Sequence, residues 1–255
     1  MKIVTLMENT TCREDLCCEH GLSLYLESGK YKILFDAGQS CAFAENAEKL
    51  GISLDQVDFC VLSHGHYDHS GGLGKFLEIN QTAKVYVSQW AFEPHYETDG
   101  RYIGVDPVLQ KNERIRFVAE KAELAEGMAL YRLDLAPSDT AGLLVEENGQ
   151  RMPDDFRHEQ YLLLEEQGKR ILISGCSHKG ILNIVEAFRP DILIGGFHFM
   201  KMTEKEKLEA AAKTLLQYDT VYYTGHCTGQ SHYAYLKKIM GERLHYIATG
   251  TQLQL

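Results

Sequence analysis

Four potential metal ligands fall within the six residues His64-Gly65-His66-Tyr67-Asp68-His69. An apolar segment at 58–62 precedes them and predicts a short buried strand that ends at this motif. Side chains two apart in an extended turn project the same way, so His64 and His66 can present two imidazoles to one ion. Asp68 and His69 would face a second ion beside the first. Imidazole and carboxylate ligands together suit zinc, and also iron or manganese.

The other interpretation of this motif is a surface loop that happens to be rich in histidine. The neighbouring residues oppose it, because Gly65, Gly71 and Gly72 allow a close approach of the backbone. The motif also stands at the end of a predicted strand, where binding sites concentrate. We therefore interpret residues 64–69 as a metal-binding loop.

Three later segments repeat this construction. Each has a short apolar strand, one or two glycines and then a side chain that can bind a ligand. The segments 171–174, 192–194 and 221–224 lead in this way to His178, His198 and His226. One such histidine would be an ordinary loop residue, but three at the same edge of a sheet indicate convergence on one site.

The order of the predicted elements indicates layered sheets with helices outside, in one domain over residues 1–255. Residues 91–126 are charged, aromatic and interrupted by Pro and Gly, so we expect an irregular excursion packed near a site. Residues 148–159 read as a polar loop. The other predicted strands are 3–7, 22–27, 31–35, 84–88, 128–134, 143–147, 160–165 and 244–248, and the predicted helices are 43–50, 180–188, 203–217 and 231–240.

Several sequence segments of the chain resemble those of the metallo-β-lactamase superfamily. They are Ile33-Leu34-Phe35-Asp36-Ala37-Gly38, Glu19-His20-Gly21-Leu22-Ser23, SHGHYDHSGGL at 63–73, GCSHKGILN at 175–183, GGFH at 195–198 and GHCTG at 225–229. Within that superfamily they are most similar to the group named after 7,8-dihydropterin-6-methyl-4-(β-D-ribofuranosyl)aminobenzene-5′-phosphate synthase. The similarity runs from about residue 8 to residue 250. It implies a mixed α/β (α+β) fold, the αββα four-layer sandwich, with a metal centre at one edge of the two sheets.

The resemblance assigns the metal loop and leaves the middle ligands open. His64, His66, Asp68 and His69 match the metal loop, His226 matches the last metal histidine, and Asp36 matches a structural acceptor for backbone N–H groups of that loop. The superfamily usually places a further histidine in a TPGHT-like loop, but the nearest stretch, 136–140, has none. Cys176 stands where a bridging Asp is expected, and His178 follows it. Either the Cys176 thiolate is a ligand, or His178 supplies the missing imidazole, or both bind; a small buried residue is the alternative for Cys176.

The remaining histidines receive separate interpretations. The resemblance implies that His20 lies at the pocket mouth, and we expect His198 to contact substrate rather than metal. Asp68 and His198 are the predicted catalytic residues. His232 is expected to support a ligand or a backbone group. His95, His158 and His245 lie in polar or charged contexts and are expected to be solvated.

One or two divalent ions, zinc first and iron or manganese as alternatives, are the expected cofactor. They would lower the pKa of bound water and polarise a carbonyl or phosphoryl oxygen. The chain has no GxSxG elbow, P-loop or GxGxxG after a strand that would favour another chemistry. We therefore expect a hydrolase that uses metal-bound hydroxide on a small ester, lactone, thioester or phosphoester. A pterin-related synthase and a non-hydrolytic diiron redox protein are the alternatives.

The charge balance bears on the partners. With 26 Lys+Arg and 36 Asp+Glu, the formal charge of −10 disfavours nucleic acid and anionic membrane as partners. Two divalent ions would reverse that sign locally, so a phosphorylated or otherwise anionic small substrate remains expected. The seven cysteines, an odd number, and the absence of signal-peptide features predict reduced thiols in the cytoplasm. Helical and aromatic surfaces are compatible with a homo-oligomer.

Overall fold

The first three strands of the chain pair with one another in antiparallel orientation. The computed structural model describes residues 1–137 and 142–255, and within them β1 pairs with β2 and β2 with β3. Gly29, at a φ of +56°, makes the tight turn between β2 and β3, a conformation that glycine adopts without strain. These strands and four others form a seven-stranded sheet in the order β17-β1-β2-β3-β4-β5-β7. Its strands are β1 (Lys2–Met7), β2 (Ser23–Ser28), β3 (Tyr31–Phe35), β4 (Phe59–Val61), β5 (Lys84–Ser88), β7 (Ile115–Val118) and β17 (Gln252–Gln254).

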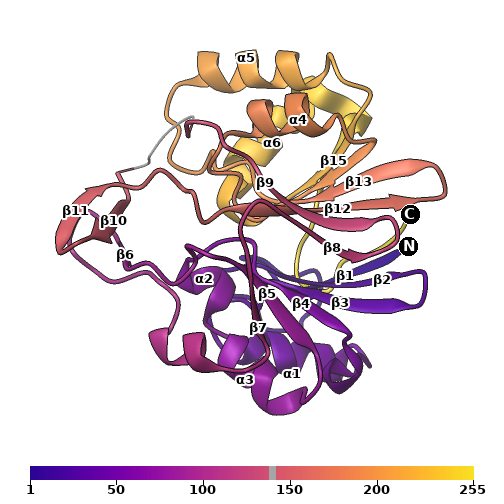
Figure 1. Cartoon of the computed structure of the whole chain (residues 1–255). Coiled ribbons are helices and arrows are strands. Elements are labelled where there is room, and N and C mark those ends of the chain that lie inside the picture. Colours follow the sequence, from indigo (N-terminus) through magenta and orange to yellow (C-terminus); the bar gives the residue numbers. More distant parts are fainter. Residues whose placement is uncertain (138–141) are drawn as a thin grey trace.

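A second seven-stranded sheet has the order β16-β15-β14-β13-β12-β9-β8. Its strands are β8 (Lys121–Ala125), β9 (Met128–Arg132), β12 (Gln160–Glu166), β13 (Lys169–Ile173), β14 (Ile192–Ile194), β15 (Val221–Thr224) and β16 (Leu244–Tyr246). A small sheet, β11-β10-β6, lies at one end of the molecule (Figure 1). It contains β6 (His95–Tyr96), β10 (Leu144–Glu147) and β11 (Gln150–Pro153).

The two large sheets lie face to face, and helices cover their outer faces (Figure 1). The α-helices are α1 (Ala42–Lys49), α2 (Tyr67–Ser70), α3 (Leu73–Ile79), α4 (Ile181–Phe188), α5 (Lys205–Leu215) and α6 (Gln230–Met240). The 3₁₀ turns are η1 (Leu54–Gln56), η2 (Pro107–Lys111), η3 (His226–Thr228) and η4 (Gly241–Arg243). Within the described ranges, no helix combines the length and the apolar character needed to cross a bilayer.

Three apolar clusters lie between these layers. One joins the first sheet to α1 and α3 through Phe43 and Phe76, and another joins the second sheet to α4 and α5 through Ile184 and Leu215. The middle cluster joins the two sheets to each other. The layers confirm the predicted αββα sandwich, and the single domain over 1–255 stays a prediction.

Two segments differ from the sequence prediction. Residues 91–126 are not irregular throughout, because β7 and β8 within them form the edges of the two large sheets. Residues 148–159 are not only a polar loop, since β11 pairs with β10. Short edge strands of mixed exposure lack the alternation of apolar residues that marks a strand in the sequence. The helices α2 and α3 and the closing strand β17 were likewise not predicted, and part of the stretch 136–140 lies outside the described residues.

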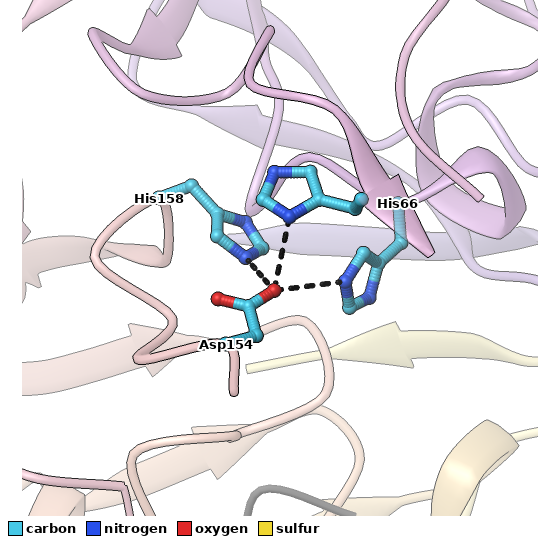
Figure 2. A group of neighbouring side chains, drawn as sticks. His66, Asp154 and His158 are labelled. Atoms are coloured by element: carbon cyan, nitrogen blue, oxygen red, sulfur yellow. Dashed lines mark hydrogen bonds and ion pairs between the residues drawn. The ribbon is translucent and has the colours of Figure 1, made fainter. Parts of the chain in front are cut away.

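A third correction concerns two histidines. His95 and His158, expected to be solvated, are fully buried next to His66. Figure 2 shows His158 and His66 pointing at Asp154 between them. The contact between His95 and Asp154 spans 59 residues of sequence, so local composition could not reveal it.

Candidate metal centre

The loops that follow the parallel strands carry polar side chains, and these loops lie at one edge of the sandwich. β13, β14 and β15 pair in parallel, so the loops after them lie together, and β3 and β4 do the same in the other sheet. Four residues in these loops have positive φ: Asp36 (59°), Ser177 (62°), His198 (55°) and His226 (48°). Non-glycine residues rarely adopt this conformation, and such strain concentrates at functional sites.

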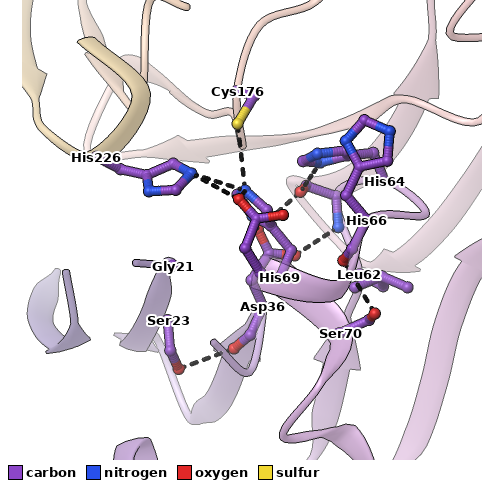
Figure 3. A network of polar contacts seen from close by, with 12 residues as sticks. Gly21, Ser23, Asp36, Leu62, His64, His66, His69, Ser70, Cys176 and His226 are labelled. Carbon is purple, nitrogen blue, oxygen red and sulfur yellow. Dashed lines mark hydrogen bonds and ion pairs between the residues drawn. The ribbon is translucent and has the colours of Figure 1, made fainter. Parts of the chain in front are cut away.

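One cluster has the shape of a tetrahedral cation site. His69 Nε2 lies 3.1 Å from His226 Nε2, 3.2 Å from Cys176 Sγ and 3.5 Å from Asp68 Oδ2. His226 Nε2 lies 3.2 Å from Asp68 Oδ2. Figure 3 shows the side chains of Cys176 and His226 pointing toward His69. Ligands about 2.1 Å from a tetrahedral zinc ion are about 3.4 Å from one another. The four side chains therefore fit one ion of this size, and we call them the four-ligand cluster.

Hydrogen bonds at the outer nitrogens leave two of these imidazoles ready to bind. Asp36 Oδ2 accepts from His69 Nδ1 at 2.6 Å, and Asn9 Oδ1 accepts from His226 Nδ1 at 2.8 Å. The amide oxygen of Asn9 is identified because it also accepts from the backbone N–H of Gly21. An imidazole that donates from Nδ1 has its lone pair on Nε2. Both Nε2 atoms therefore face the cluster as acceptors for a cation.

A second cluster joins His64 and His178 to Cys176, so this cysteine belongs to both. Ser63 Oγ donates its one proton to Asp36 Oδ2 at 2.7 Å and therefore accepts from His64 Nδ1 at 2.8 Å. This leaves the lone pair of His64 on Nε2, which is buried and has no hydrogen-bond partner among the described residues.

Among the described residues, His178 lacks hydrogen-bond partners at both ring nitrogens, whereas His64 lacks one only at Nε2. His178 is 2 % exposed. Its ring stacks on Phe156 at 4.1 Å between centroids and lies 5.0 Å from the rings of both His64 and His66. Buried polar atoms are normally satisfied, so these nitrogens indicate a missing partner such as a cation. Both candidates that the sequence left open, His178 and Cys176, lie in this second cluster, and their role as ligands stays a prediction.

Electrostatics at the four-ligand cluster also fit a cation. Burial alone would raise the pKa of Asp68, but His69, His20 and His226 hold it well below its ordinary value. Burial alone would lower the pKa of His69, but the charges of Asp36 and Asp68 raise it to about 9. In the metal-free protein His69 is thus protonated, and a cation would replace that proton. Burial and the adjacent Cys227 raise the pKa of Cys176 well above its ordinary value, so its thiolate needs a bound cation.

The other predicted site histidines surround this centre. A pocket opens onto it, lined in part by His20, His66, His178 and His198. His20 lies at the mouth, 45 % exposed, with Nε2 3.3 Å from Asp68 Oδ2. The ring of half-buried His198 lies 4.3 Å from that of His178. His20 therefore lies at the pocket mouth, and the contact of His198 with a substrate stays a prediction.

Two predicted supporting residues lie farther out. His232 Nε2 donates to the carbonyl of Met202 at 2.8 Å, which supports a backbone group near the pocket. His245, expected to be solvated, is half-buried and stacks on Tyr223. The sequence prediction missed Asn9, because one asparagine in a polar segment carries no signal of its own.

The fold and this constellation define a class of protein. A model of the metallo-β-lactamase superfamily matches residues 18–226, and the chain belongs to that superfamily.

Three relatives cover nearly the whole chain. The 7,8-dihydropterin-6-methyl-4-(β-D-ribofuranosyl)-aminobenzene-5′-phosphate synthase of Methanocaldococcus jannaschii is 29% identical over 90% of this chain and 88% of its own length. The uncharacterized protein MJ0448 of the same organism is 29% identical over 89% of this chain and 91% of its own length. The crystal structure of Tm1679, described as a metal-dependent hydrolase of the β-lactamase superfamily, is 31% identical, covers 100% of this chain and 99% of its own, and has a TM-score of 0.86.

The shared position of Cys176 leads to a paired prediction. We expect Cys176→Asp to retain metal, because a carboxylate oxygen can replace the sulfur in both clusters. Cys176→Ala offers no ligand atom, so its metal dissociation constant should rise at least about ten-fold. Competition with a chelating dye measures both constants, and equal affinity in the two variants would show that Cys176 is not a ligand.

Proposed function

We propose that this protein is a metal-dependent hydrolase with a dinuclear centre that acts on a small anionic ester, lactone, thioester or phosphoester. The observation that carries this proposal is the pair of clusters that share Cys176, in which the lone pairs of His64, His69 and His226 point inward. The first ion would be held by His64, His178 and the shared Cys176, together with the neighbouring His66, and the second by the four-ligand cluster. Imidazole, thiolate and carboxylate ligands together favour zinc.

Divalent ions at such a centre lower the pKa of water and polarise the oxygen of the bond that is broken. The side chains of this protein would hold the cations, orient the attacking water and bind the substrate. Asp68 Oδ2 lies within 3.5 Å of His20, His69 and His226, so it can hold a cation and orient the attacking water. His198, in the pocket wall beside His178, is placed to donate a hydrogen bond to the substrate.

The pocket mouth indicates the class of substrate. Arg101 and Lys201 line it, with side chains 54% and 64% exposed, and both lie near Glu97. Ile103 and Leu143 add apolar surface. These two cations share the carboxylate of Glu97, so a net positive charge lies above the apolar wall and fits a small molecule with an acidic group and an apolar body.

A pterin-related synthase is the second candidate, supported by the similarity over 90% of this chain to the enzyme named as such. The pocket could accept its phosphorylated aromatic substrate in the same way. Purified protein loaded with zinc, manganese or iron would be tested on a panel of esters, lactones, thioesters and phosphoesters, and separately on the dihydropterin with the phosphorylated ribofuranosyl-aminobenzene. Hydrolysis of a panel member supports the first proposal. Metal-loaded protein that hydrolyses none of them contradicts it, and turnover in the second assay alone supports the synthase.

Replacing Arg101 tests the acidic part of the substrate. We expect Arg101→Gln to raise KM for an acidic substrate about ten-fold, because one exposed charged hydrogen bond is lost. The change in kcat should stay within about two-fold, and KM for a neutral ester of the same body should not change. Arg189→Gln, which removes an exposed arginine on α4 paired with Glu186, is the matched control. An equal loss on acidic and neutral substrates would exclude this role for Arg101.

A further inference from the structure

Asp154 is a buried carboxylate surrounded by histidines beside the metal loop. It is 1% exposed, and its Oδ2 lies 2.9 Å from His95 Nδ1, 3.2 Å from His158 Nε2 and 3.9 Å from His66 Nε2. Its other oxygen accepts from the backbone N–H of Phe156 at 2.7 Å. All three imidazoles are buried. This group of His66, His95, Asp154 and His158, which we call the Asp154 group, is compact enough to hold a cation or to serve the adjacent centre.

The direction of one hydrogen bond decides between these roles. The backbone N–H of Gly65 donates to His158 Nδ1 at 2.8 Å. A backbone amide can only donate, so His158 Nδ1 has no proton and the proton of the neutral ring is on Nε2. His158 Nε2 therefore donates to Asp154 and has no lone pair for a metal. This arrangement is the reverse of that in His64, His69 and His226, whose outer nitrogens donate.

Gly65 makes this bond possible. A Cβ at this position would lie 2.4 Å from the carbonyl oxygen of Ala91 and 3.1 Å from His95 Nε2. Only glycine allows the metal loop to pass so close to both segments. The loop is thereby attached to the Asp154 group by its own backbone.

Asp154 remains charged in this environment. Its oxygens accept hydrogen bonds from His95, His158 and the backbone N–H of Phe156, and these bonds stabilise the carboxylate form. Burial and the neighbouring His95 lower the pKa of His158 to about 3, so this ring is neutral. Among the described residues, no Lys or Arg forms an ion pair with Asp154. A buried carboxylate without a cationic partner is costly, and a divalent ion on the far side of the His66 ring would supply the opposite charge.

We propose that Asp154, held by hydrogen bonds from His95 and His158, is a positioning residue for the metal ligand His66. It faces the Nε2 edge of His66 and selects the form of the ring that carries its proton there. The ring then has its lone pair on Nδ1, which would bind the ion beside His64 and His178, whose rings lie 4.6 Å and 5.0 Å from that of His66. The distance of 3.9 Å between His66 Nε2 and Asp154 Oδ2 is longer than a hydrogen bond. A movement of the His66 ring by about 1 Å on metal binding would form the bond. This inference rests on the proposed metal centre.

Nuclear magnetic resonance of the wild-type protein with ¹⁵N-labelled histidine tests the proposal without a mutation. In the metal-free protein we expect His158 to carry its proton on Nε2. After loading with ¹¹³Cd, we expect coupling of cadmium to His66 Nδ1 and none to His95 or His158. Coupling of cadmium to His158 Nε2 or His95 Nδ1 would overturn the proposal, because the Asp154 group would then be a metal site itself.

A pair of adjacent variants tests the effect on affinity. Asp154→Asn keeps the shape but removes the charge and one acceptor, so we expect the affinity for one of two metal equivalents to fall about 10–100-fold. Asp155→Asn makes the same change at the next residue, which is exposed and whose carboxylate accepts from the backbone N–H of Arg157. This control should bind metal like the wild type, and thermal unfolding verifies that both variants fold. Affinity in Asp154→Asn within two-fold of the control would refute the positioning role.

A failure of the positioning role can be distinguished from a failure of the proposed function, because metal binding and hydrolysis are measured separately. If the wild-type protein binds two equivalents of zinc but hydrolyses no substrate, the function fails and the positioning of His66 is still measured. If the wild-type protein binds no zinc, cadmium or manganese, both proposals fail.

Discussion

Replacing His69 by Ala is expected to remove one equivalent of bound metal and to lower kcat/KM for hydrolysis at least about a thousand-fold, or about 4 kcal/mol in transition-state stabilisation. His69 Nε2 touches each of the other three members of the four-ligand cluster, at 3.1 to 3.5 Å. Without it, Asp68, Cys176 and His226 cannot enclose an ion tetrahedrally. Elemental analysis of the purified variant gives the metal content, and steady-state kinetics on the best panel substrate give the rate.

The control for this experiment is His245→Ala. His245 stacks on Tyr223 in the same sandwich but lies outside both clusters. This variant should keep two equivalents of metal and the wild-type rate to within about two-fold. If His69→Ala kept both equivalents, the four-ligand cluster would not be a metal site.

Asp36→Asn is expected to lower the free energy of unfolding of the metal-free protein by about 3 kcal/mol. Asp36 is 1% exposed and accepts from Ser63 N, Ser63 Oγ and His69 Nδ1 at 2.6 to 2.7 Å. Asparagine has one acceptor oxygen fewer, and an NH₂ group in place of Oδ2 leaves both Ser63 Oγ and His69 Nδ1 without their acceptor. The left-handed conformation of residue 36 is not the cause, because asparagine tolerates it. Urea denaturation measures the difference.

The same substitution should also weaken metal binding. An amide NH₂ group that donates to His69 Nδ1 would move the ring proton to Nε2 and remove the lone pair from the four-ligand cluster. The loss of stability depends on pH. Because the folded-state pKa of His69 is raised to about 9, its stabilising charge is fully present below pH 6.5 and disappears as the pH rises through 9. The difference between wild type and variant should therefore be largest near pH 6 and smaller near pH 10.

Asp58→Asn is the control for Asp36→Asn. Asp58 accepts one exposed backbone N–H, from Lys32 at 2.8 Å, so its replacement should change the free energy of unfolding by less than about 1 kcal/mol. Equal effects of the two substitutions would show that the network around Asp36 does not stabilise the fold.

The strands that carry the site were predictable because their signals are local. A short apolar run ends in glycine and then a histidine at His178, His198 and His226, and parallel pairing of β13, β14 and β15 brings these ends together as expected. The motif at 64–69 was recognised for the same reason, although the sequence did not predict that Asp68 and His69 lie in a helix, α2. The edge strands β7 and β8 were missed, because edge residues of mixed exposure have no clear period.

The sequence by itself determined the sandwich, the metal loop and the strand ends that meet it, because each depends on residues close together along the chain. Only the tertiary structure decided which nitrogen of each imidazole is free. That choice depends on partners far away in sequence, such as Asp36 for His69 and Asn9 for His226. It also separated His178, whose ring nitrogens have no hydrogen-bond partner among the described residues, from His158, whose Nδ1 accepts from the backbone N–H of Gly65. The physical reason is that a histidine binds a cation only through an unprotonated nitrogen, and its folded neighbours decide where the proton sits.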